Sequence, residues 1–152
     1  MKPPEPDLSQ RPFTCTIERT MLASPEVVYS AFTEQFDRWF AAPGTLIIKA
    51  EVNVPFFFET HMDGQRHPHY GRFLKLVPNQ QLELTWVTGN PGTHGAETRV
   101  SIELTPQGDG TQVKLTHAGF PDEEIRNGHA EAWPQVLAHL DRCMTDQKNG
   151  PD

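Results

Sequence analysis

Apolar and polar residues alternate along several short segments of this chain, which is the period expected of a half-buried β-strand. Turn residues such as Asp63-Gly64 and Pro78-Asn79 separate the later segments by only a few positions. Such short connections indicate that neighbouring strands run antiparallel. The pattern predicts seven strands, over residues 13–22, 45–52, 56–62, 69–77, 82–86, 100–104 and 112–117.

The period changes to that of a helix directly after the first strand. Ser24 suits an N-cap, Pro25 the first helical position and Glu26 the positive end of the helix dipole. A second short helix is expected before Pro43-Gly44, which ends it. The apolar residues that predict these two short helices are Val27, Val28, Ala31, Phe32, Phe36, Trp39 and Phe40.

A long amphipathic helix is predicted near the C-terminus, with Asp122 as its cap. Pro134 conflicts with an uninterrupted helix because proline cannot donate a backbone hydrogen bond. We therefore expect a short helical piece from Asp122, and a main helix from about His129 with a distortion at Pro134. The apolar stripe consists of Trp133, Val136, Leu137, Leu140 and Met144.

These elements predict one α+β domain in which an antiparallel sheet of six or seven strands carries the long helix. The domain is expected over residues 13–146. The proline-rich residues 1–12 are expected to form a flexible arm, and residues 147–152 a tail.

Composition narrows the possible partners of the chain. The net charge of -7 argues against nucleic acid and anionic membranes as principal partners. No apolar run is long enough for a membrane span, and the N-terminus lacks an apolar signal core, so a cytoplasmic location is expected. The two cysteines lack the spacing of a zinc or redox motif.

Catalytic and cofactor motifs are missing from the sequence, so we expect no cofactor and assign no catalytic residue. His61, His67 and His69 form a weak candidate metal cluster, and we expect no metal there because the ligand set is incomplete. His117 and His129 could be core histidines or could face a cavity. Glu59 falls on the polar phase of its strand, as does Glu83, so both are expected on a solvated face.

Several short motifs, in their order and spacing, resemble one known family over about residues 13–144. Residues 24–32 resemble the first helix of START-like (SRPBCC) helix-grip proteins. The whole series is similar to the single-domain bacterial form of the family named for the activator of the Hsp90 ATPase. The further motifs are Trp39, Pro43-Gly44, Gly71-Arg72, Pro78, residues 82–86, residues 108–111, residues 115–120, Trp133, Leu137 and Leu140.

The resemblance implies a curved sheet wrapped round the C-terminal helix, with a hydrophobic cavity between them. It implies no settled activity, because the cochaperone work of the eukaryotic namesake depends largely on a further domain. Our leading hypothesis is a domain that binds a small apolar molecule (a lipid, polyketide or aromatic compound) and has no catalysis of its own. The residues expected to line the cavity are Phe32, Trp39, Phe56, Phe58, Trp86, His117, Trp133 and Leu137.

Two alternatives remain open from the sequence. The chain could be a chaperone-assisting or dimerising interaction module, with Phe57 on an exposed apolar face and a homodimer as one form. It could also be a cyclase- or hydrolase-like enzyme that uses His117 in the cavity.

Overall fold

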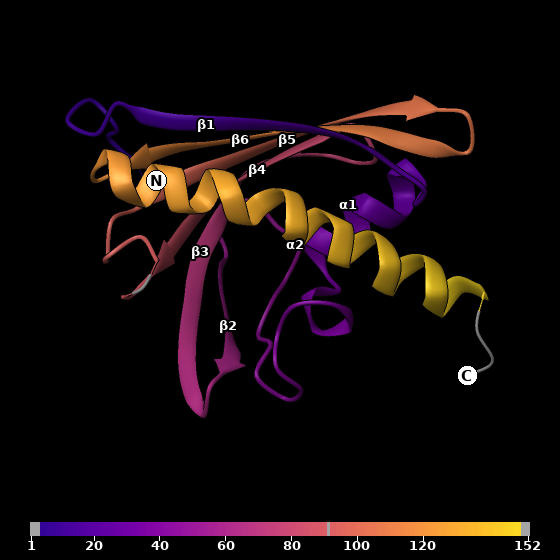
Figure 1. Cartoon of the computed structure of the whole chain (residues 1–152), viewed down its shortest axis with the longest axis horizontal. Coiled ribbons are helices and arrows are strands. Elements are labelled where there is room, and N and C mark those ends of the chain that lie inside the picture. The colour runs from indigo at the N-terminus through magenta and orange to yellow at the C-terminus, as the bar shows by residue number, and fades with distance from the viewer. Residues whose placement is uncertain (1–3, 91, 150–152) are drawn as a thin grey trace.

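The computed structural model of the chain describes residues 4–90 and 92–149, with side chains as far as Thr145. Its six strands form one antiparallel sheet in the order β1-β6-β5-β4-β3-β2, and the long helix α2 crosses one face of it (Figure 1). The predicted α+β helix-grip architecture is confirmed. The elements are β1 (Phe13–Met21), α1 (Pro25–Thr33), the 3-10 helix η1 (Phe36–Arg38), β2 (Pro55–Met62), β3 (Gln65–Val77), β4 (Gln81–Thr88), β5 (Thr98–Gln107), β6 (Gly110–Phe120) and α2 (Glu123–Asn149).

Both predicted helix caps are present. The hydroxyl of Ser24 accepts a hydrogen bond from the backbone N–H of Val27 at 3.3 Å, with Pro25 in the first turn of α1. The carboxylate of Asp122 accepts from the N–H of Ile125 at 2.8 Å and so caps α2. Each cap satisfies a donor that the first turn of a helix leaves without an intrahelical partner.

The helix α2 is continuous through Pro134, so the prediction of two pieces that meet near His129 was wrong. The side chain of Pro134 lies on the exposed side of the helix. There the carbonyl group of Ala130, which proline leaves without a donor, can be hydrated by water. The energetic cost of the missing backbone hydrogen bond is therefore local, and the buried apolar stripe of α2 continues beyond Pro134.

The strand predicted over residues 45–52 is absent, and two isolated bridges replace it. Ile47 exchanges both backbone hydrogen bonds with Phe57, at 2.8 and 2.9 Å, and Val52 pairs once with Phe73. The segment passes along the outer edge of β2 and leaves Ile47 68% exposed. Its apolar residues mimic a strand pattern without a continuous ladder.

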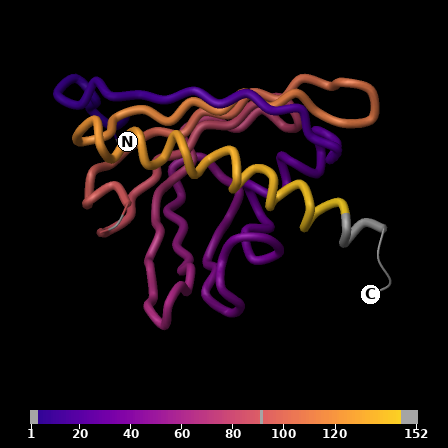
Figure 2. The backbone as a smooth tube through the Cα atoms, in the orientation of Figure 1, coloured from indigo at the N-terminus to yellow at the C-terminus, as the bar shows by residue number. Residues whose placement is uncertain are grey.

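The β2–β3 hairpin bends away from the rest of the sheet, as the backbone trace shows (Figure 2). The ladder between β3 and β4 pairs Tyr70 and then Phe73, with neither Gly71 nor Arg72 paired between them. The N–H of Arg72 instead donates to the hydroxyl of Thr85 at 2.9 Å. A Cβ atom on Gly71 would lie 2.1 Å from the carbonyl oxygen of Thr85, so only glycine fits this approach.

The N-terminal segment, predicted as a flexible arm, makes specific contacts with the end of the sheet. The guanidinium group of Arg11 donates to the carbonyl oxygens of Gly119 and Glu97, at 2.7 and 2.6 Å. Leu8 packs over Gly119, whose missing side chain leaves room for it. These contacts hold residues 8–11 against β6.

Candidate ligand-binding site

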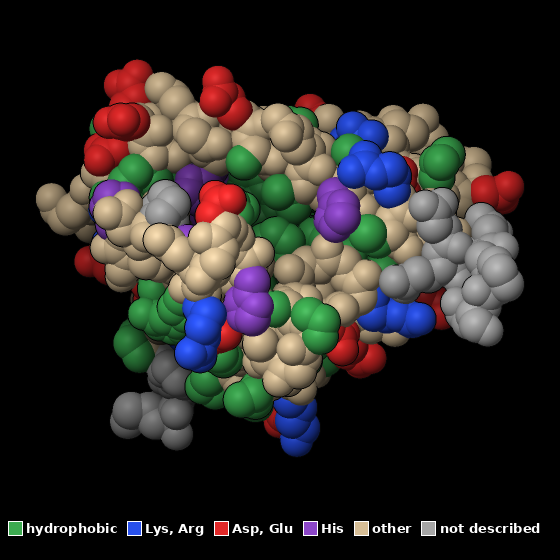
Figure 3. Space-filling model, turned by 60° about the horizontal axis from the view of Figure 1, so that its bottom comes forward, with side chains coloured by type: hydrophobic (Ala, Val, Ile, Leu, Met, Phe, Trp, Pro, Cys, Tyr) green, Lys and Arg blue, Asp and Glu red, His purple; other side chains and the backbone are tan. Residues whose placement is uncertain are grey.

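A cavity of about 730 Å³ lies between the β2–β3 hairpin, the end of β4 and α2. Phe40, Trp86, Trp133 and Val136 supply its apolar wall. The face that looks out past α2 carries hydrophobic side chains together with histidines (Figure 3). The cavity exists because the hairpin leaves the sheet at an angle instead of closing over the helix.

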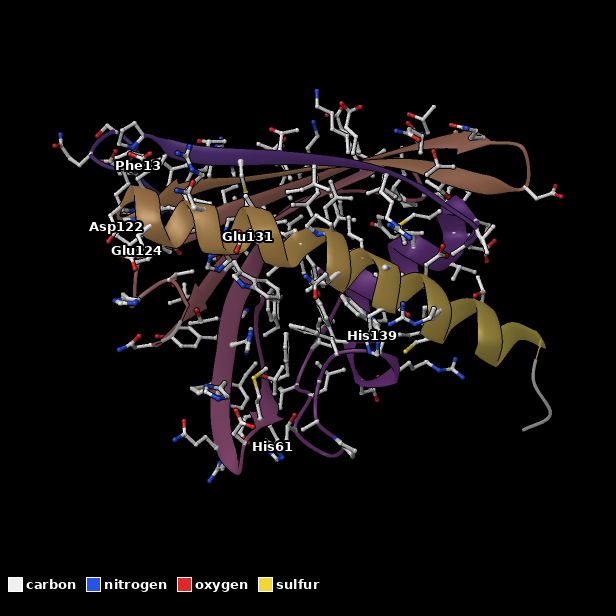
Figure 4. All side chains as sticks on the ribbon, viewed as in Figure 1. Phe13, His61, Asp122, Glu124, Glu131 and His139 are labelled. Carbon is white, nitrogen blue, oxygen red and sulfur yellow. The ribbon has the colours of Figure 1, made fainter. Side chains whose placement is uncertain are left out.

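A second hollow of about 590 Å³ adjoins the cavity at the N-terminal end of α2. Asn90, Gly92, His129 and Ala132 line both spaces. The outer hollow is also bordered by acidic residues, Asp122 and Glu124, which lie together at the start of α2 (Figure 4). The site therefore has an apolar inner part and a more polar, acidic mouth, with His129 at the boundary.

Of the eight residues expected to line the cavity, Trp86 and Trp133 do so, with ring centroids 5.9 Å apart. The others belong to the close-packed core behind the wall, where each side chain is at most 5% exposed. Aromatic contacts hold many of them in place, such as the stacking of Phe36 on Phe58 at 4.7 Å. The residues in the core are Phe32, Trp39, Phe56, Phe58, His117 and Leu137.

His117 is completely buried, and both of its ring nitrogens have partners. Its Nδ1 accepts from the indole N–H of Trp133 at 3.0 Å, so Nε2 carries the proton and donates to the hydroxyl of Thr98 at 2.7 Å. That hydroxyl donates in turn to the carbonyl oxygen of Trp86 at 2.6 Å. Burial, and secondarily the charge of His129, hold the pKa of His117 well below its usual value. A satisfied core histidine of this kind leaves no nitrogen free for a ligand.

His67, His69 and His129 line the cavity, and the last two are the more buried. His69 stacks on Phe58 at 4.9 Å and meets Trp86 edge-on at 5.3 Å. Burial lowers the pKa of His69 to about 4, and burial also lowers the pKa of His129. The rings of His69 and His129 are therefore neutral at pH 7.

His129 was predicted either as a core histidine or as one that faces a cavity, and the structure places it in the cavity lining, whereas His69 was predicted only as part of a weak metal cluster. The signal that could have placed His129 is its spacing of four residues before Trp133, which puts both on one face of α2. His69 lies directly opposite Phe58 across the hairpin, and so on the inner face. Its burial could not be foreseen without the bend at Gly71.

Glu59 was predicted on a solvated face, and this was wrong, because it is 7% exposed. The segment after η1 covers it, with the N–H of Ala42 bonded to the carbonyl oxygen of Glu59 at 2.7 Å. Arg66 binds its carboxylate with two nitrogens and His61 lies 3.2 Å away. The hydrogen bond from Arg66, more than any other contact, lowers the pKa of Glu59 to about 2.

The three histidines considered as metal ligands do not converge. His61 shares the outer face of the hairpin with Glu59, and Figure 4 shows it at the far end of the hairpin from α2. His67 and His69 lie on the inner face. Among the residues with described side chains, no three histidine, cysteine or carboxylate groups are placed to hold a metal ion.

The described part of the chain contains no helix that is both long and apolar enough to cross a membrane. None of the curated proteins compared matches the sequence. A protein of Chromobacterium violaceum, known from its crystal structure, is 27% identical, with a TM-score of 0.74 over 93% of this chain and 100% of that chain. A protein of Mesorhizobium loti is 25% identical, with a TM-score of 0.69 over 88% and 97% of the two chains.

The Aha1 dimer of Colwellia psychrerythraea, solved in solution, is 21% identical, with a TM-score of 0.65 over 86% of this chain and 95% of that one. At this identity the likeness shows the fold. The family model described as "Activator of Hsp90 ATPase homolog 1-like protein" matches residues 22–145, which span every helix and strand except β1 and the last turn of α2. The chain therefore belongs to the family of Activator of Hsp90 ATPase homolog 1-like proteins.

Proposed function

We propose that this protein binds a small, largely apolar molecule in the cavity between the β2–β3 hairpin and α2. The observation that carries the proposal is the cavity itself, about 730 Å³ with Trp86 and Trp133 side by side in its wall. Its volume lies within the range of small-molecule sites, roughly 300–1,000 Å³. Proteins with this fold commonly bind hydrophobic ligands, which is consistent with a cavity wall built from indole and phenyl rings.

The close packing of the core supports a binding site beside α2 rather than between α2 and the sheet. Leu137 and Phe58 are fully buried, so the space directly under α2 is filled by side chains. A ligand would instead lie against Trp86, Trp133 and Val136 at the open side. Covering these side chains would contribute about 25 cal/mol for each Å² of apolar surface removed from water.

Native mass spectrometry of the purified protein, followed by calorimetric titration with any molecule found bound, tests the proposal. In the variant Val136→Phe the larger side chain occupies part of the cavity, whereas Gln135→Phe adds the same ring at the exposed neighbouring position of α2. We expect Val136→Phe to abolish binding and Gln135→Phe to retain it. Equal affinity in the two variants would place the ligand elsewhere.

A second candidate function, self-association, is favoured by the outer face of the hairpin. Ile47 is 68% exposed and Tyr70 48%, and both lie next to Phe57 through backbone pairing. The related structure from Colwellia psychrerythraea is a dimer. Sedimentation velocity should then report a dimer that Tyr70→Lys dissociates and Leu22→Lys, at a 79% exposed apolar site elsewhere, leaves intact. A wild-type monomer at all concentrations would exclude this candidate.

A further inference from the structure

The polar atoms inside the cavity indicate which kind of ligand it would select. The Nδ1 atom of His69 lies 2.9 Å from the carbonyl oxygen of His67. A carbonyl oxygen only accepts, so this nitrogen carries the ring proton. In the neutral ring, Nε2 is then an acceptor. It has no protein partner among the described residues, yet it is not sealed from solvent. Since His69 is 91% buried and lines the cavity, its free nitrogen is reached from the cavity.

His129 has the same arrangement on the opposite wall. Its Nδ1 donates to the carbonyl oxygen of Ile125 at 2.9 Å, one turn earlier in α2. Its Nε2 atom also lacks a protein partner among the described residues and is open to solvent at the boundary of the two hollows. The cavity therefore offers hydrogen-bond acceptors on both the hairpin and the helix.

Trp86, which also lines the cavity, adds a hydrogen-bond donor. It is 5% exposed, and its indole N–H has no partner in the described part of the chain, although it is not sealed from solvent. The indole of Trp133 differs, because its N–H is taken by His117. An unpaired buried donor is costly unless water or a ligand satisfies it. Trp86 thus presents both a flat apolar face and an unused N–H to the cavity.

The charges around the cavity do not suit an anion. Arg66 is the cation among the lining residues, and its guanidinium group is already bound to the carboxylate of Glu59. Asp63 lines the inner cavity, and Asp122 and Glu124 border the outer hollow. A carboxylate ligand would meet these negative charges and the lone pairs of His69 and His129, with no free lysine or arginine in the described lining to offset its lost hydration.

We infer that the cavity selects a neutral, flat molecule bearing hydrogen-bond donors, such as a hydroxylated aromatic compound, in preference to a carboxylate such as a fatty acid. The inference rests on the proposed function, since it specifies the ligand class of the same cavity. The aromatic part lies against Trp86 and Trp133. Hydroxyl groups donate to Nε2 of His69 and of His129, and one hydroxyl oxygen accepts from the Trp86 N–H.

Three compounds with the same ring system test this preference: a dihydroxynaphthalene, the matching dimethoxynaphthalene and the matching naphthalene dicarboxylate. Each is titrated into the wild-type protein at pH 7 by isothermal calorimetry. The diol should bind at least about tenfold more tightly than the ether, which cannot donate to the histidines. The difference in affinity between the diol and the dicarboxylate should be larger still. An ether or a dicarboxylate that binds as tightly as the diol would overturn the inference while leaving the proposed function intact.

Failure of all three compounds to bind would overturn the proposed function and this inference together. The variant His129→Phe distinguishes hydrogen bonding from aromatic contact, because it removes the acceptor nitrogen and keeps an aromatic side chain. We expect it to reduce the preference for the diol over the ether, whereas His139→Phe, an exposed position later in α2, should preserve it. An unchanged preference in His129→Phe would remove His129 from the site. The wild-type ranking needs no substitution, so the test holds even if a variant does not fold.

Discussion

Trp133 in α2 donates its indole N–H to Nδ1 of His117 in β6 at 3.0 Å, so that helix and sheet are joined by a hydrogen bond between two buried rings. The bond fixes the tautomer of His117 and thereby directs its other nitrogen to Thr98. It also orients the indole whose face lines the cavity. Packing of the core and shape of the site therefore depend on the same pair.

Trp133→Phe keeps a large ring but removes the donor. We expect it to lower the free energy of unfolding by about 1–3 kcal/mol, because Nδ1 of His117 would be left buried and unpaired. Urea denaturation measures the change. A double-mutant cycle with His117→Leu should give a combined loss smaller than the sum of the two single losses. Strict additivity would show that the two rings do not act as a pair.

Stability should fall as the pH is lowered from 7 towards 4.5. The pKa of His117 lies well below 6.5 in the folded state, and that of His69 is about 4. The unfolded chain takes up protons on these residues near pH 6.5, while the folded protein does not. Above pH 6.5 these two histidines make their full contribution to the free energy of unfolding. On acidification this contribution is lost, by up to about 1.4 kcal/mol per pH unit for each histidine.

Urea denaturation at a series of pH values measures this slope. Below about pH 4.5 Glu59 steepens it, because its pKa of about 2 in the folded protein is lower than in the unfolded chain. The variant His69→Phe preserves the stacked ring and should reduce the slope between pH 6.5 and 4.5. A stability that does not change over that interval would contradict the neutral, buried state of these histidines.

Local signals predicted most of the fold. The alternation of β1 and β6 and the caps Ser24 and Asp122 depend on residues within a few positions, and the structure contains all four. The strand expected over residues 45–52 failed because apolar composition does not specify a backbone partner along the whole segment.

The site was less predictable, because its shape depends on contacts between distant segments. The positions of Trp86 and Trp133 in the cavity wall were predicted from the periodicity of apolar residues. The burial of Glu59 and of His69 was not, since the first requires the chain after η1 to fold over the hairpin and the second requires β3 to bend. Neither arrangement has a signature in the neighbouring sequence.

Asp141 joins α2 to the connection between β1 and α1, and its replacement should be costly. Its two carboxylate oxygens accept from the backbone N–H groups of Leu22 and Ala23, each at 2.9 Å, and its side chain is buried. Asp141→Ala leaves both donors without partners, so we expect a loss of about 2–5 kcal/mol in the free energy of unfolding. Glu131→Ala, at an exposed position of the same helix (Figure 4), should change it by less than about 0.5 kcal/mol. Comparable losses in both variants would argue against a specific clamp.

Gly71 and Gly128 should respond to alanine in opposite directions. At Gly71 the added Cβ would lie 2.1 Å from the carbonyl oxygen of Thr85, so the bend that opens the cavity cannot persist unchanged. We expect Gly71→Ala to destabilise the protein by more than about 3 kcal/mol, or to fold with a weakened ligand affinity. In α2 nothing lies within 4 Å of the position that a Cβ on Gly128 would occupy, and alanine there should add about 0.5–1 kcal/mol. Urea denaturation of both variants gives the comparison, and a Gly71→Ala protein with wild-type stability would show that β3 does not need glycine to leave the sheet.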